Sequence, residues 1–124
     1  MAYSVDLDKL SFSAPLRDQC EDHGSFLENA PFSPVKCWWF EDVDKALASL
    51  GVDAVRMDDL WMGEESGSTW GTQEVQRAAE QAQGVSDEQV QALEDRYLRE
   101  AVDTALEWIR TAAARDEGIV GFYH

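Results

Sequence analysis

Hydrophobic and polar residues alternate at the start of the chain and then give way to helical spacing. Residues 2–7, Ala-Tyr-Ser-Val-Asp-Leu, alternate with period two, which predicts a short strand. Pro15 and Gly24 bracket residues 16–23, which predicts a helix of about two turns. The prolines within residues 29–34 exclude a helix or a central strand, so a loop is expected there.

The middle of the chain contains a compact aromatic run. Residues 35–40, Val-Lys-Cys-Trp-Trp-Phe, are predicted to form a second strand. Residues 43–50 follow as a helix, with Asp42 as its N-cap and Gly51 as its C-terminal cap, because their apolar side chains share one helical face. Residues 52–57 predict a third strand.

Residues 58–71 are the least regular part of the sequence and are expected to form a loop. Thr72 is predicted to cap a helix that runs to about Gln83. Ser86 and Gln89 have the spacing of a capping box, which predicts the longest helix over residues 87–115. The apolar residues 119–123 predict a last strand.

This order of elements predicts an α+β fold in a single domain spanning residues 1–124. Its sheet is expected to be mixed or antiparallel, with about four strands, and helices packed on it. One long C-terminal helix precedes the final strand. A chain of 124 residues is long enough to bury a core of its own.

Charge is the strongest feature of the composition. The chain has 25 Asp and Glu against 10 Lys and Arg, a net charge of −15. Direct binding to nucleic acid needs a basic surface, which this sequence lacks. Two interpretations remain: the charge maintains solubility, or an acidic face recognises a basic protein.

The beginning of the chain has neither the basic start nor the apolar run of a signal peptide, and no apolar stretch is long enough to span a membrane. A cytoplasmic protein without membrane contact is therefore expected. In that compartment Cys20 and Cys37 are predicted to be reduced thiols, at least one of them buried.

The tryptophans supply the candidate binding residues. In a strand over residues 35–40, Trp38 and Trp39 face opposite sides, and the more apolar face predicts that Trp39 is core and Trp38 is partly exposed. On the loop, Trp61 and Trp70 either cover the open side of the sheet or anchor a partner. The predicted partner-binding residues are Trp38, Glu41, Asp42, Asp58, Asp59, Trp61, Glu64, Glu65 and Trp70.

No motif predicts a catalytic residue or a cofactor. Ser66 lacks the glycine spacing of a nucleophile elbow. Cys20, His23 and Cys37 are zinc-type ligands, but one Cys-x-x-His half-site without a second pair does not predict a metal centre.

Three segments carry a resemblance: A-Y-S-V-D-L-D-K-L at the start, W-G-T-Q-E-V-Q-R-A-A after the loop, and L-E-W-I-R-T-A-A-A-R-D-E-G-I-V-G-F-Y-H at the end. They resemble the YfbM-like group of small acidic bacterial proteins, a domain of unknown function. The resemblance implies an α+β fold and a bacterial or phage origin, and it implies no activity.

Together these observations predict a non-enzymatic, acidic protein-binding module. It would act as an inhibitor or immunity-type protein that blocks a basic surface of a nucleic-acid enzyme. The alternative is a small-molecule or metal-dependent enzyme that uses loop 58–71 as its pocket.

Overall fold

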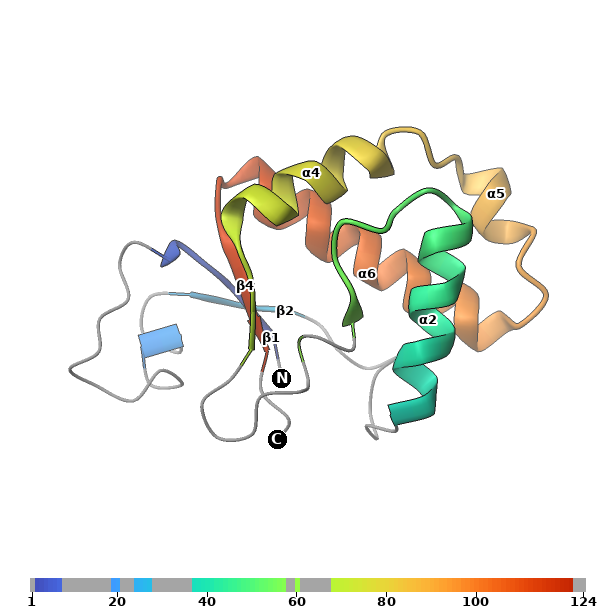
Figure 1. The fold of residues 1–124 in the computed structure, drawn as a ribbon, viewed down its shortest axis with the longest axis horizontal. Coiled ribbons are helices and arrows are strands. Elements are labelled where there is room, and N and C mark those ends of the chain that lie inside the picture. Colours follow the sequence, from blue (N-terminus) through green and yellow to red (C-terminus); the bar gives the residue numbers. More distant parts are fainter. Residues whose placement is uncertain are drawn as a thin grey trace.

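The computed structural model in Figure 1 describes residues 2–7, 19–20, 24–27, 37–57, 60 and 68–121, with the backbone alone at residues 37–39 and 68. Its described residues form one sheet with helices packed on it. The predicted α+β class is therefore confirmed.

The sheet has four strands, and all of its pairs are antiparallel. The strands are β1 (Ala2–Val5), β2 (Ser25–Leu27), β3 (Ser68–Trp70) and β4 (Gly118–Gly121), in the order β2-β1-β4-β3. The two central strands come from the two ends of the chain, with Tyr3 opposite Val120. Both central strands are buried along their whole length, and the buried Ser4 hydroxyl in β1 donates a hydrogen bond to the Glu117 carboxylate at 2.8 Å.

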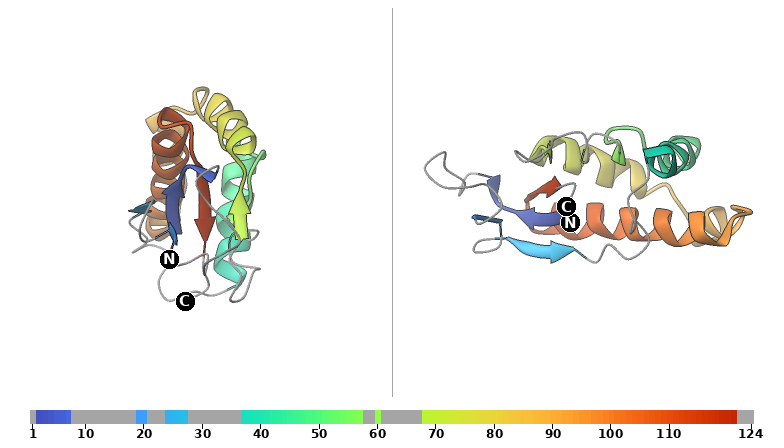
Figure 2. Two further views of the ribbon diagram at one scale, coloured as in Figure 1. Left: turned by 90° about the vertical axis from the view of Figure 1, so that its left-hand side faces the viewer. Right: turned by 90° about the horizontal axis from the view of Figure 1, so that it is seen from below.

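The helices lie mainly on one face of the sheet, as Figures 1 and 2 show. They are α2 (Cys37–Ser49), α4 (Thr72–Ala82), α5 (Asp87–Gln91) and α6 (Arg96–Ala114). Helix α6 packs against α4, α2, α5 and the central strands. Its apolar face, including Trp108 and Ile109, is buried in the main core, as the spacing of its apolar residues predicts.

A second, smaller cluster lies on the opposite face of the sheet. It contains Tyr3, Val5, Cys20 and Val120, with Leu7 packed against it. Because side chains alternate along a strand, Ala2 and Ile119 point to the helical side instead and join the main core. The sheet therefore has apolar contacts on both of its faces.

The predicted strand over residues 35–40 is wrong, because α2 already includes Cys37 to Phe40. Phe40, Val43 and Leu47 are all buried at helical spacing, so packing on one helical face overrides the strand preference of the aromatic run. Asp42 is consequently inside the helix and is not its N-cap. The strand-parity argument for Trp38 and Trp39 loses its basis, and their side chains lie outside the described residues.

Residues 52–57 form no strand, which corrects a second prediction. The third strand in chain order is instead β3, at the end of the segment expected to be a loop, where it pairs with β4. Gly51 has a φ of 90° and ends the preceding helix, as predicted.

The predicted helix over residues 87–115 is interrupted. The capping box of Ser86 and Gln89 is present as predicted, but it opens only the short helix α5. Asp95 then caps a new helix, α6, because its side chain accepts hydrogen bonds from two backbone N–H groups. The N-cap of α4 is Gly71, one residue before the predicted position.

In the N-terminal segment, the predicted helix over residues 16–23 is described only at Gln19 and Cys20, and both are helical. The predicted loop over residues 29–34 lies outside the described residues. The last strand is confirmed as β4, up to Gly121.

Candidate functional site

Most of the predicted partner-binding residues fall in the segment between α2 and β3. Asp58, Asp59, Trp61, Glu64 and Glu65 lie outside the described residues, as does the side chain of Trp38 on α2. The enzyme alternative depends on the same loop. Both hypotheses about loop 58–71 therefore stay predictions.

Glu41 and Asp42 are both exposed on α2. The Glu41 carboxylate lies 3.4 Å from the Lys45 ammonium one turn later, and both side chains are largely exposed, so the pair contributes little stability. Asp42 forms no hydrogen bond or ion pair with another residue that the structure describes. Its carboxylate is therefore accessible to an external cation.

Trp70 is a core residue. Only 1% of its surface is exposed, and its indole N–H donates a hydrogen bond to the Arg56 carbonyl oxygen at 2.9 Å. The sequence left two roles open for Trp70, covering the open side of the sheet or anchoring a partner. The buried position corresponds to the first role. Its predicted place on an exposed binding patch does not fit this burial, so Trp70 is not part of an exposed binding surface.

Residues 53–57, which follow α2, are held in place by side chains. The Gln81 amide oxygen accepts from the backbone N–H groups of Asp53 and Ala54, each at 3.0 Å, and the amide nitrogen donates to the Asp53 carboxylate at 2.6 Å. The Asp44 carboxylate accepts from the backbone N–H of Met57 at 2.6 Å. These polar groups are engaged in shaping the backbone and are not poised for chemistry.

A groove of about 240 Å³ lies between β2 and α6. This volume is smaller than the roughly 300–1,000 Å³ of typical small-molecule sites. The described residues that line it are Ser25, Phe26 and Leu27 from β2 and Thr104, Glu107, Trp108, Thr111 and Arg115 from α6 and its C-terminal cap.

The residues from α6 recur every three or four positions, so they lie along one flank of that helix. Leu27 and Trp108 are buried and form the apolar floor, while Glu107 and Arg115 carry opposite charges toward the two ends of the flank. The Thr104 hydroxyl donates to the Glu100 carbonyl oxygen of its own helix at 2.8 Å. Among the described residues that line the groove there is one carboxylate and no histidine, cysteine or lysine, so this set of residues favours binding over acid–base catalysis.

Phe26 and Tyr97 are the exposed large hydrophobic residues in the described part of the chain, at 53% and 67%. The Phe26 ring meets the Tyr3 ring edge to face, with centroids 5.6 Å apart. Neither Phe26 nor the flank of α6 was predicted from the sequence as part of a site. The run Ser-Phe-Leu after Gly24 is a short strand signal, and the spacing of Thr104, Thr111 and Arg115 marks a polar flank beside an apolar face.

Cys20 is a fully buried free thiol, in agreement with the expectation of at least one buried thiol. Burial raises the pKa of Cys20 to about 11, because the thiolate would lose its hydration. His23 and the side chain of Cys37 lie outside the described residues. Among the residues that are described, no group of three or more Cys, His, Asp or Glu is placed to hold a metal ion.

No helix among the described residues is long and apolar enough to cross a membrane.

Comparison with known proteins assigns a family without an activity. No curated protein and no solved structure matches the chain. No named homologue supports the resemblance to the YfbM-like group. The sequence model of a family described as Domain of unknown function (DUF7691) matches residues 13–124, and the chain therefore belongs to this family.

Proposed function

We propose that this chain is a non-enzymatic, acidic protein-binding module whose partner is a basic protein. The observation that carries the proposal is the excess of accessible acid on the folded surface. Exposed acids among the described residues are Glu41, Asp42, Asp53, Glu74, Glu80, Asp87, Glu88, Glu94, Asp95, Glu100, Asp103, Glu107 and Asp116, whereas the exposed bases are Lys45, Arg56, Arg77, Arg96, Arg110 and Arg115.

Ion pairs within the described part of the chain neutralise little of this charge. Between described residues, the ion pairs are Lys45 with Glu41 and Arg96 with Glu100, and each joins neighbouring turns of one helix. The carboxylates of Asp42, Glu80, Glu88, Asp103 and Glu107 form no hydrogen bond or ion pair with another described residue. They remain available to a partner, and a surface of one dominant sign accelerates the approach of a protein with the opposite sign.

We further propose that this basic partner is an enzyme acting on nucleic acid, and that this chain inhibits it. Such enzymes present basic surfaces because they must bind phosphates. An acidic protein that occupies this surface competes with the substrate through the same charges. A net charge of −15 on 124 residues suits that role.

The proposal is tested by capture from the native host with the tagged protein. At low ionic strength, about 20 mM, we expect a basic protein to be retained, and at about 500 mM we expect it to be released, because salt screens exposed charges. A variant with Asp42→Asn, Glu80→Gln and Asp103→Asn should retain less of it. The matched control Asp42→Glu, Glu80→Asp and Asp103→Glu keeps the charge and should retain as much as the original protein. Failure to retain any basic protein at low salt would refute the proposal.

A further inference from the structure

We infer that the groove between β2 and α6 binds an extended segment of the partner, which adds to β2 as a fifth strand and alternates basic with apolar residues. This inference rests on the proposed function for its basic partner. It adds the surface, the conformation of the bound segment and the residue pattern that the surface selects.

β2 is an edge strand, paired with β1 on one side, and no other strand of the described chain pairs with its outer side. Figure 2 shows β2 beside α6 at this edge. Natural edge strands are commonly protected by charges or proline, but Ser25, Phe26 and Leu27 provide neither. An open edge of this kind can accept an extended peptide by main-chain hydrogen bonds.

The two faces of the sheet carry different side chains at this edge. Leu27 pairs with Ala2, and both join the core under the helices. Phe26 pairs with Tyr3, which belongs to the cluster on the opposite face. An added strand would therefore place alternate side chains next to α6 and next to the exposed ring of Phe26.

On the exposed side of α6, Asp103 and Glu107 are one turn apart and form no ion pair with another described residue. Glu107 also lines the groove. Basic side chains on the α6 side of the added strand would meet these carboxylates, while apolar side chains on the other side would cover Phe26. Arg115 at the far end of the flank disfavours a basic residue there.

A second copy of this chain is a poorer occupant. Pairing β2 with its own copy would bring together two chains that each carry −15, with Asp103 and Glu107 near the contact in both. The charges therefore favour a basic segment.

The test uses two peptides of one composition, both acetylated and amidated: Lys-Val-Lys-Thr-Lys-Val-Lys and the block order Lys-Lys-Lys-Lys-Val-Val-Thr. Calorimetric titration should give at least about threefold tighter binding for the alternating peptide, because only this order separates the two faces of a strand. Amide chemical shifts should change at Ser25, Phe26 and Leu27. Equal affinities, or shifts confined to other elements, would overturn the inference.

Matched variants separate the groove from general attraction. Glu107→Lys should weaken the alternating peptide about three- to tenfold, since an attraction becomes a repulsion. Glu88→Lys makes the same charge change on α5, outside the groove lining, and should weaken it less than about twofold. Equal losses from the two variants would overturn the groove assignment. Capture of a basic protein that is insensitive to Glu107→Lys would overturn this inference and leave the proposed function standing.

Discussion

Glycines in β4 show how closely single residues determine the packing of the sheet. A Cβ added at Gly118 would lie 2.7 Å from the Trp70 carbonyl oxygen and 2.7 Å from Cδ1 of Leu7. The carbonyl belongs to the neighbouring strand and cannot move without disturbing the strand pairing. The φ of Gly118 is not in the left-handed region, so the backbone conformation itself does not require glycine. Glycine is required because there is no space for a Cβ.

Gly118→Ala should destabilise the protein by about 1–3 kcal/mol, the usual cost of overpacking. Gly84→Ala is the control, because its nearest contact would be 3.5 Å from the Gln81 carbonyl oxygen. That variant should be neutral or slightly stabilising. Urea unfolding of the two variants measures both effects, and equal stabilities would contradict the close contact in the sheet.

The buried thiol of Cys20 predicts a dependence of stability on pH. Its pKa in the folded protein, about 11, lies above the ordinary value of 9.0, so the unfolded state loses the proton first. The stability contributed by the neutral thiol is complete below 9.0 and is lost as pH rises toward 11. The wild-type protein should therefore lose more stability over this window than Cys20→Ala does. Urea titrations at both ends of the window measure the difference, and identical pH dependence in the two proteins would refute it.

At the scale of elements, local signals identified strand β1, the capping box before α5 and the Gly51 cap, because each depends on residues close in sequence. The strand predictions at 35–40 and 52–57 failed for a different reason. Phe40 joins Val43 and Leu47 in the core, and in the segment after Gly51 the backbone N–H groups donate hydrogen bonds to Gln81, which is distant in sequence. Such tertiary contacts override local preference.

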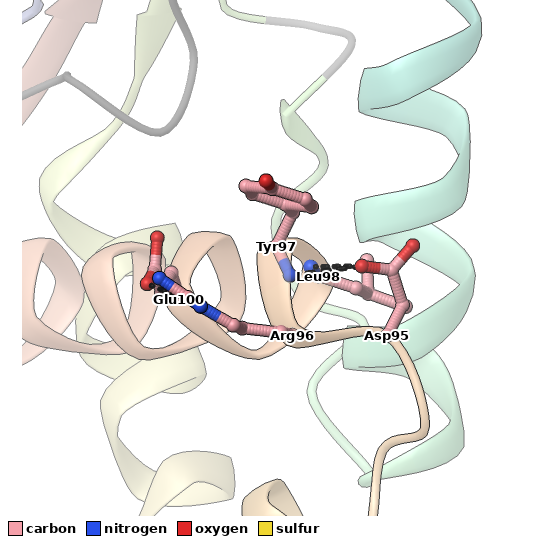
Figure 3. Close-up of polar contacts among 5 residues, drawn as sticks. All are labelled: Asp95, Arg96, Tyr97, Leu98 and Glu100. Carbon is pink, nitrogen blue, oxygen red and sulfur yellow. Dashed lines mark hydrogen bonds and ion pairs between the residues drawn. The ribbon is translucent and has the colours of Figure 1, made fainter.

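The side chain of Asp95 caps the start of α6, as Figure 3 shows. The Asp95 carboxylate accepts from the backbone N–H groups of Tyr97 at 2.8 Å and Leu98 at 3.3 Å. Asp95→Ala should cost about 0.5–2 kcal/mol, as the loss of an N-cap does, whereas Asp95→Asn should retain most of the stability. Thermal unfolding compares the two variants. If both melt like the wild type, the cap does not determine the start of α6.

At the scale of the whole molecule, the sequence was sufficient for the fold class and for the acidic character of the surface, because both follow from composition and pattern. It was not sufficient for the groove. That surface joins Phe26 to Glu107, residues far apart in the chain, and only the order of strands brings them together. The burial of Trp70 likewise depends on its pairing with Ile119 in the neighbouring strand.

For the molecule as a whole, we propose that its negative charge attracts a basic partner. The most direct test is the association rate constant with the protein captured at low salt, measured from about 20 to 500 mM ionic strength. We expect the association rate constant to fall at least about tenfold over this range while the dissociation rate constant changes much less, because electrostatic steering acts on the approach of the two proteins. An association rate that stays constant with ionic strength would contradict it.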